Sequence, residues 1–260
     1  MSGALLTMIR DLGRRRGRER RGLALAEGIR LVEEAVAAGI PLRGAAIAPA
    51  LETTARGRSL KSNLAARDIR IQDVSEAELA DLADTDQPQG IVAVIEPRVW
   101  RLEDIPVTPG SVTLVLDAVQ DPGNVGTMLR TAFGLGAAGA VALKGTAELT
   151  SPKVLRGSMG ALFKLPAVQA DPEDFLAWAR AQRIRILVTA ADGEPLEAGR
   201  VARAKRPPVA VVVGNEGAGV GAALTAAADQ RLAIPLAAGA ESLNVAVAAG
   251  IFLYEVMRAD

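Results

Sequence analysis

Residues 112–136 read VTLVLDAVQDPGNVGTMLRTAFGLG, an apolar run that leads through a polar loop into a helical pattern. Continuous apolar runs recur at 140–143, 184–189 and 209–213, with helix-like stretches between them. Such runs are typical of parallel strands that are covered on both faces, whereas half-exposed strands alternate. The C-terminal part is therefore predicted to be an α/β domain with a doubly wound, mostly parallel sheet.

The N-terminal part has shorter segments of mixed type. Residues 96–109 hold three prolines and no sustained periodicity, which is typical of a linker between domains. We therefore expect a small α/β domain at 1–98, a linker at 99–109 and the larger domain at 110–260. In the small domain, helices are predicted over most of 23–38 and at 60–67 and 76–84, and strands at 44–48, 69–73 and 90–95.

The composition excludes several kinds of chemistry. The chain has no Cys and no His, so disulfides, thiol nucleophiles, imidazole bases and the common zinc sites are ruled out, and no metal is expected. No apolar run approaches the ~20 residues of a membrane helix. The first apolar residues precede the arginines, the reverse of a secretory signal. We expect a cytoplasmic protein with no membrane partner.

One dense basic segment lies near the N-terminus. Lys plus Arg equals Asp plus Glu at 30 each, so any nucleic-acid contact must come from a local patch of this kind. The segment at 10–21 is either a solvated helical face or a phosphate-binding surface. Its basic members are Arg10, Arg14, Arg15, Arg16, Arg18, Arg20 and Arg21.

The loop after the first apolar run carries the first candidate site. Ligands of open α/β sheets bind outside the carboxyl ends of the strands. Asn124 stands where a helix N-cap is expected, and Arg130 lies between Gly126 and Gly134 on one helical face, an arrangement that suits a phosphate. The alternative is that Asn124 only caps the helix and Arg130 only pairs with a surface carboxylate.

Two further loops are unusual. Gly214-Asn215-Glu216-Gly217-Ala218-Gly219 follows the run at 209–213, and its glycines allow a ligand to approach the backbone closely. The third loop holds Ile234-Pro235-Leu236 and then Ser242-Leu243-Asn244-Val245, in which Ser242 or Asn244 can cap the last helix. That helix, at 245–256, is apolar on nearly every side, so we expect it to be buried, with a subunit interface as a natural place.

Residues 134–139, GLGAAG, fit the dinucleotide fingerprint G-x-G-x-x-G by letters alone. They follow a helix and precede a strand, whereas the fingerprint follows a strand and opens a helix. We interpret them as a helix end and a turn, which makes a nicotinamide-dependent enzyme an unfavoured alternative.

Together the three loops closely resemble the SpoU (TrmH-like) family of RNA ribose 2′-O-methyltransferases. The motifs that carry the resemblance are Asn124-Val125-Gly126 with Arg130, Gly214-Asn215-Glu216-Gly217, and Ile234-Pro235 with Ser242-Leu243-Asn244-Val245. Residues 156–161, RGSMGA, are similar to a segment between the first two motifs. The N-terminal half resembles the family's small substrate-binding domain in Glu27-Gly28-Ile29-Arg30 and Pro88-Gln89-Gly90-Ile91.

The resemblance implies methyl transfer from S-adenosylmethionine to a ribose 2′-hydroxyl of RNA, by a homodimer with a trefoil knot of the SPOUT type. Members with the N-terminal domain usually modify ribosomal RNA, so rRNA is favoured over tRNA. The implied catalytic residues are Asn124, Arg130, Glu216, Ser242 and Asn244. The implied cofactor-binding residues are Thr189, Gly214, Asn215, Gly217, Ile234, Leu236 and Leu243. RNA contacts are expected from the arginines of 10–21 and from Arg30 and Arg156.

The roles of the charged groups stay open. Arg130 is the family's usual candidate for activating the hydroxyl, but a guanidinium stays protonated in proteins. We therefore expect it to bind phosphate and to stabilise developing alkoxide. Glu216 could act as the base or fix the second loop, and we favour the second role. The alternatives for the whole protein are a tRNA methyltransferase, or a non-catalytic RNA-binding or ribosome-assembly protein of the same fold.

Overall fold

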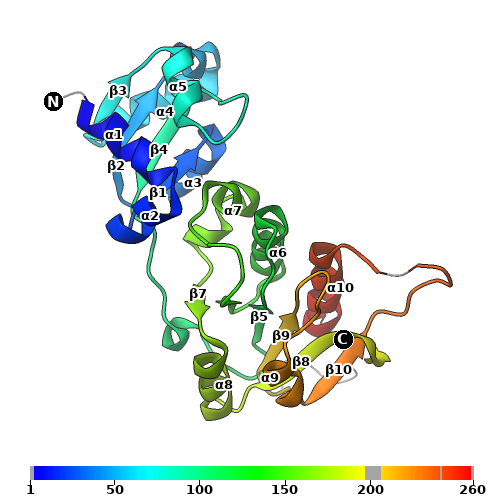
Figure 1. The fold of residues 1–260 in the computed structure, drawn as a ribbon. Helices are drawn as coiled ribbons and strands as arrows, with labels where there is room; N and C mark the ends of the chain where they lie inside the picture. The colour runs from blue at the N-terminus through cyan, green and yellow to red at the C-terminus, as the bar shows by residue number, and fades with distance from the viewer. Residues whose placement is uncertain (1–2, 197–205, 241, 259–260) are drawn as a thin grey trace. The chain divides into compact units, whose positions relative to one another are not determined.

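The computed structural model describes residues 3–196, 206–240 and 242–258. Two compact units divide the chain, Met1–Arg98 with Thr150–Phe163, and Val99–Leu149 with Lys164–Asp260 (Figure 1). None of the helices among the described residues is long and apolar enough to cross a membrane.

The first unit is built on a four-stranded sheet with the order β1-β4-β2-β3. β4 is antiparallel to both of its neighbours, whereas β2 and β3 are parallel. The strands are β1 (Ala24–Glu27), β2 (Leu42–Ile47), β3 (Ile71–Asp73) and β4 (Ile91–Ile95).

Helices cover both faces of this sheet, because alternate residues of β4 enter two different cores. Ile91, Ala93 and Ile95 join the core under α3 (Ile29–Ala37) and α4 (Ala55–Ala66). Val92 and Val94 join the core under α1 (Gly3–Leu12) and α5 (Glu76–Leu82). The shorter elements of the unit are α2 (Arg15–Arg21), η1 (Pro49–Thr53), α7 (Pro152–Ser158) and η3 (Ala161–Phe163).

The prediction of a single helix over 23–38 is wrong in its first part. Ala24–Glu27 is a strand that is buried along its length and paired with β4, and the helix starts only at Ile29. Between them Gly28 has a φ of 92°, which suits glycine and ends the strand. Alanine-rich residues carry no strand signal, so the pairing, and not local propensity, decides the conformation here.

The segment around α7 packs with the first unit, although it lies between strands of the second unit in sequence. Leu155 and Phe163 are buried in the core beneath α3 and α4. A Cβ at Gly160 would lie 2.7 Å from the Cβ of Glu34, so only glycine fits there without a shift. The RGSMGA segment therefore lies between two residues of the core of the N-terminal unit.

The second unit contains a six-stranded sheet in which every pair is parallel, with the order β10-β8-β9-β5-β6-β7. This confirms the predicted parallel α/β sheet. α6 (Pro122–Leu135) and α10 (Val245–Met257) pack together over β5. α8 (Pro172–Ala181) and α9 (Ala222–Ala226) contribute side chains to a separate hydrophobic core of this unit. The strands are β5 (Val112–Leu116), β6 (Gly139–Leu143), β7 (Ala167–Ala170), β8 (Arg185–Pro195), β9 (Val209–Val213) and β10 (Gln230–Ala233).

The residues around 99–109 also belong to the second unit. η2 (Leu102–Asp104) lies within this stretch, and Ile105 is buried in the core beside β6. Farther along, Gly136 ends α6 with a φ of 81°, and Gly139 begins β6. The fingerprint-like glycines are thus a helix end and a turn, as interpreted from the sequence.

Candidate active site

Three loops lead out of the carboxyl ends of β5, β9 and β10. β5 and β9 are neighbours in the sheet, so the first two loops leave from adjacent strands. α6 follows the first loop and α10 follows the third, and these two helices pack against each other. The strand order and the helix packing together gather the three predicted motifs at the edge where parallel sheets bind ligands.

The first helix after β5 is capped by Asp121, so the prediction that Asn124 caps it is wrong. The Asp121 carboxylate accepts a hydrogen bond of 2.7 Å from the backbone N–H of Asn124. Pro122 follows at the first helical position, where no backbone N–H is needed. Asn124 is consequently the third residue of α6, and its side-chain amide is available for contacts outside the helix.

That amide joins all three loops. Asn124 Nδ2 donates to Glu216 Oε1 at 2.9 Å, and Asn124 Oδ1 accepts from Asn244 Nδ2 at 3.1 Å. Asn244 is the N-cap of α10, and its Oδ1 accepts from the backbone N–H groups of Ala246 and Val247 at 2.9 and 3.3 Å. We call Glu216, Asn124 and Asn244 the amide chain.

The direction of every hydrogen bond in the amide chain follows from the cap. Because backbone N–H groups only donate, Asn244 must present Oδ1 to α10 and Nδ2 to Asn124. Asn124 must then accept on Oδ1 and donate through Nδ2, so Glu216 receives a donor. A carboxylate is the natural acceptor at the end of this chain.

The second loop is closed by Asn215. Asn215 Oδ1 accepts from the backbone N–H groups of Gly217 and Ala218 at 2.9 and 3.0 Å, and Nδ2 donates to the carbonyl of Ala118 at 3.0 Å. A Cβ at Gly214 would lie 2.2 Å from the backbone of Gly219, so the loop folds only with glycine at that position. The Asn215 side chain is therefore fully engaged in shaping the loop.

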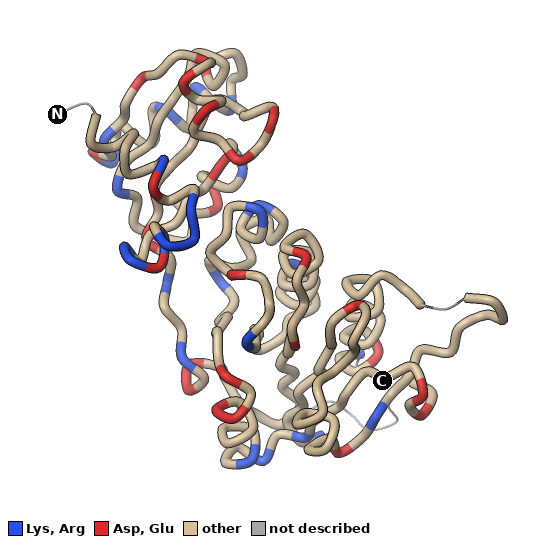
Figure 2. Tube along the Cα trace, in the orientation of Figure 1, with Lys and Arg blue, Asp and Glu red and all other residues tan. Residues whose placement is uncertain are grey.

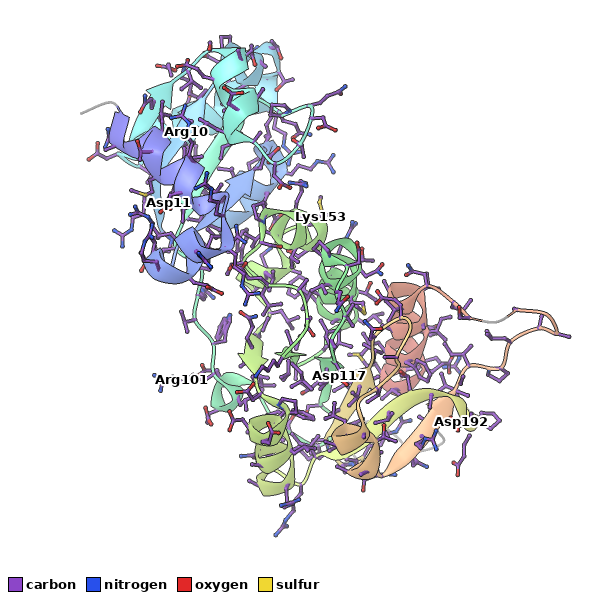
Figure 3. The ribbon with its side chains drawn as sticks, in the orientation of Figure 1. Arg10, Asp11, Arg101, Asp117, Lys153 and Asp192 are labelled. Atoms are coloured by element: carbon purple, nitrogen blue, oxygen red, sulfur yellow. The ribbon has the colours of Figure 1, made fainter. Side chains whose placement is uncertain are left out.

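Asp117 is a structural residue of the site that sequence reasoning did not single out. It directly follows β5, is 7% exposed, and accepts a 2.7 Å hydrogen bond from the backbone N–H of Gly221 (Figure 3). Its own backbone N–H donates to Val213 at 2.8 Å. A carboxylate placed directly after a buried strand was the available signal, and it ties the first loop to the second.

The third loop has the features of a site that is read through its backbone. Among the described residues 234–240 and 242–244, the backbone N–H of Ala240 donates to Ala237, and the other N–H groups have no backbone partner in the described part of the chain. Leu236 and Leu243 are each 39% exposed. Free backbone amides beside apolar side chains fit a ligand such as an adenine nucleoside.

Other predicted site residues stand outside the amide chain. Arg130 lies six residues after Asn124 on α6, about 9 Å farther along the axis and about a third of a turn around it. It is exposed and makes no hydrogen bond or ion pair with the described residues. Ser242 is exposed and likewise bonds to no described residue, Ile234 is half-buried, and Thr189 lies in β8 beside Phe252 of α10.

Figure 2 shows the basic residues of the segment in blue near the N-terminus. Their side chains fall into two groups, those paired within the chain and those available for a ligand. Arg20 and Arg21 pair with Asp11 at 2.8 and 2.6 Å, and the hydrogen bonds from Arg21 and then Arg20 hold the pKa of that carboxyl below its ordinary value. Arg15 pairs with Glu19 at 2.7 Å. Arg18 is 6% exposed and caps backbone carbonyls. Arg10, Arg14 and Arg16 form no side-chain hydrogen bond or ion pair with the described residues.

Of the two remaining arginines that are predicted to contact RNA, one is available and the other is paired within the chain. Arg30 is exposed and makes no hydrogen bond or ion pair with the described part of the chain. Arg156 donates to Asp84 at 3.0 Å and lies 3.5 Å from the buried carboxylate of Glu27. No group of Asp and Glu side chains among the described residues could hold a metal ion.

Comparison with known proteins matches both halves of the chain. The SpoU rRNA methylase family model covers residues 111–254, and the MRM3-like substrate-binding domain model covers 6–93. The 23S rRNA (uridine(2479)-2′-O)-methyltransferase of Streptomyces viridochromogenes is 32% identical over 253 residues, which are 95% of this chain and 86% of that protein. The 23S rRNA (guanosine(2553)-2′-O)-methyltransferase RlmP of Bacillus subtilis is 37% identical over 184 residues, 70% of this chain and 71% of that one.

A solved structure agrees with the sequence matches. The crystal structure of an AdoMet-bound rRNA methyltransferase from Sinorhizobium meliloti has a TM-score of 0.84 at 32% identity, covering 98% of this chain and 95% of that chain. The first family model spans more than half of the present sequence and includes all three loops. The chain therefore belongs to the SpoU rRNA methylase family.

Proposed function

We propose that this protein transfers a methyl group from S-adenosylmethionine to a ribose 2′-hydroxyl of ribosomal RNA. The observation that carries the proposal is the amide chain, which joins one residue from each of the three loops through hydrogen bonds of 2.9 and 3.1 Å. Side chains connected in this way are held in fixed positions, and positioning is the main demand of an in-line displacement.

The second and third loops are the proposed cofactor site. When bound, S-adenosylmethionine supplies an electrophilic methyl group. Gly214, Ile234 and Leu243 would hold it largely through backbone groups, with Thr189 and Leu236 beside it. Asn215 and Gly217 would act by shaping the second loop, since the Asn215 amide is committed to backbone groups. The trefoil knot that the resemblance implies stays a prediction.

The first loop is proposed to face the ribose. Asn124 and Asn244 would orient the hydroxyl, with Ser242 beside them, and Arg130 would bind a phosphate and stabilise developing alkoxide. Glu216 is proposed to hold the second loop against Asn124, because its carboxylate already accepts the Asn124 amide.

The substrate is proposed to be rRNA because both 23S rRNA methyltransferases named above carry that substrate in their names. Residues 1–98 are proposed as the RNA-binding domain and residues 110–260 as the methyltransferase domain. A cytoplasmic location of the protein is proposed as well, because it is consistent with an rRNA substrate. The two relatives modify different nucleosides, uridine and guanosine, so the modified base does not follow from family membership.

A homodimer is proposed on the exposed side of α10. Val247 and Tyr254 are 53% and 51% exposed and lie seven residues apart, on one face of the helix, with the half-buried Ile251 between them. The opposite side of α10 packs on α6 and the sheet. A second copy would cover this apolar stripe and bring the two active sites near the subunit boundary.

Mapping of 2′-O-methyl groups tests the function. The full chain and its Asn124→Ala variant are incubated with S-adenosylmethionine and unmodified 23S rRNA transcript, and methylated positions are mapped by reverse-transcription stops. One methylated ribose is expected with the wild type and none with the variant, while calorimetry finds the cofactor bound by both. Cofactor binding without methylation of rRNA or tRNA would favour a non-catalytic RNA-binding protein, and methylation of tRNA alone would assign that substrate.

A further inference from the structure

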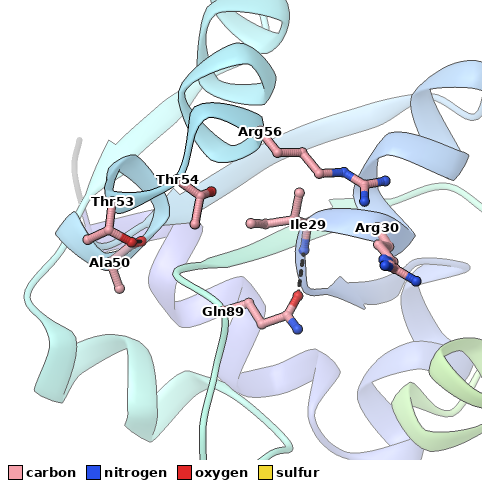
Figure 4. Close-up of a pocket in the computed structure, with 7 residues that line it drawn as sticks. All are labelled: Ile29, Arg30, Ala50, Thr53, Thr54, Arg56 and Gln89. Carbon is pink, nitrogen blue, oxygen red and sulfur yellow. Dashed lines mark hydrogen bonds between the residues drawn. The ribbon is translucent and has the colours of Figure 1, made fainter.

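A pocket of about 380 Å³ lies in the first unit, away from the three loops in sequence (Figure 4). Its volume is within the ~300–1,000 Å³ range of small-ligand sites. Two segments that resemble the substrate-binding domain meet at it, 27–30 and 88–91. The lining residues are Ile29, Arg30, Ala50, Thr53, Thr54, Arg56 and Gln89.

The backbone segments that form this pocket pack closely against each other. Gly90 has a φ of 80°, and a Cβ there would lie 2.2 Å from the backbone nitrogen of Leu51, so the 88–91 segment approaches η1 only because residue 90 is glycine. Its carbonyl accepts from Ala48 at 3.0 Å. The backbone N–H of Ala50 donates to Glu76 at 2.6 Å. The wall of the pocket is therefore held in place by contacts within the chain.

The Gln89 amide has a defined orientation. Its Oε1 accepts from the backbone N–H of Ile29 at 3.3 Å, which turns Nε2 away from that bond (Figure 4). Nε2 has no partner among the described residues. The pocket thus offers an N–H donor to a ligand that carries a carbonyl or ring-nitrogen acceptor.

Of the two arginines that line the pocket, one is paired with a carboxylate and the other is not. Arg56 Nε donates to both Glu33 oxygens at 3.0 and 2.7 Å, and this carboxylate raises the pKa of Arg56. Its guanidinium plane is consequently held still, and its charge is balanced. Arg30 has no such partner, so its charge is available for an anion.

We propose that this pocket receives one unpaired nucleotide of the RNA substrate, an inference that rests on the proposed function. Proteins recognise unpaired RNA bases by stacking them on apolar or guanidinium surfaces and by hydrogen bonds to their edges. The base lies between Ile29 and the Arg56 guanidinium, Gln89 Nε2 donates to an acceptor on its edge, and Arg30 contacts its phosphate.

Two variants and a matched control test this pocket. Arg30→Gln removes the available charge, and Gln89→Glu keeps an acceptor for Ile29 but replaces the donor with a carboxylate. Arg67→Gln is the control, because Arg67 is an exposed residue at the far end of α4 and its loss changes the net charge equally. Affinity for unmodified 23S rRNA transcript is measured by filter retention, and KM and kcat with labelled S-adenosylmethionine.

Both pocket variants are expected to weaken RNA binding and raise KM about tenfold or more, the effect of losing one contact to a charged or oriented group. Cofactor affinity, kcat and the control are expected to be unchanged. If both pocket variants bind RNA with an affinity within twofold of wild type, the proposal that this pocket receives a nucleotide is wrong. A wild-type chain that binds RNA through this pocket but methylates none would overturn the proposed function instead.

Discussion

At the scale of single residues, Glu216 decides between two mechanisms. Its carboxylate accepts the Asn124 amide at 2.9 Å. Glu216→Gln keeps an oxygen that can accept this bond but removes a basic group. If Glu216 only fixes the second loop, the variant should keep methylation within about tenfold of wild type, since the charge-assisted bond becomes a neutral one.

The outcome is measured as kcat with saturating RNA and cofactor. A general base contributes roughly 10²- to 10⁴-fold, so a loss of that size would assign the proton transfer to Glu216 and contradict the loop-fixing role. Glu103→Gln is the matched control, because Glu103 is exposed in η2, which is part of none of the three loops, and forms no side-chain bond with the described residues.

The sequence predicts which residues gather but not what each one does. Asn124, Glu216 and Asn244 are all candidates from their motifs, and the structure joins them directly. Which asparagine caps a helix depends on where the helix begins, and Asp121 with Pro122 starts α6 three residues earlier than expected. The role of Asp117 depends on a partner more than a hundred residues away, which local pattern does not reveal.

At the scale of elements, Asn244 has two functions that substitutions can separate. It caps α10 through Oδ1 and donates to Asn124 through Nδ2. Asn244→Ala should lower stability by about 1 kcal/mol through loss of the cap and also stop methylation. Asn244→Asp should keep the cap, because aspartate accepts from the same backbone groups, but should lose the donor to Asn124.

Thermal unfolding and methylation are measured together on the two variants. The expected pattern is a melting temperature close to wild type for Asn244→Asp, roughly 2–4 °C lower for Asn244→Ala, and strongly reduced methylation for both. Full methylation by Asn244→Asp would show that the bond to Asn124 is dispensable, and would remove the amide chain from the mechanism.

The basic segment around α2 gives a second prediction for an element. Arg14 and Arg16 are exposed and without described partners, whereas Arg20 is paired with Asp11. If the available side chains contact phosphates, Arg14→Gln with Arg16→Gln should reduce the slope of log K against log salt by up to roughly 1.5. Arg20→Gln should change it less. Equal slopes in all variants would indicate that the segment is only a solvated helical face and does not contact phosphates.

The elements that the sequence missed are those that depend on neighbours. β7 and β10 are the two edge strands of the large sheet, each four residues long, and the exposed half of β10 lacks the apolar run that marks the central strands. β1 is alanine-rich and is recognisable as a strand only through its pairing with β4. Central strands are predictable because burial on both faces demands apolar residues.

At the scale of the whole molecule, the proposed homodimer depends most on α10. A change at an isologous interface counts twice, once for each copy. Val247 is about half exposed, so covering it stabilises by roughly 0.8 kcal/mol per copy, and Val247→Asp would also place an unpaired carboxylate in the interface. The variant should therefore raise the dimer dissociation constant by at least roughly tenfold. Light scattering should show the mass fall from twice 26.9 kDa to 26.9 kDa.

Val99→Asp is the matched control, because Val99 is 90% exposed in the same unit but lies outside α10. It should leave the mass unchanged. Methylation should fall together with the dimer if each active site needs the neighbouring copy, and should persist in the monomer if it does not. A wild-type chain that is already monomeric at micromolar concentration, or a Val247→Asp chain that still dimerises, would contradict pairing through this face.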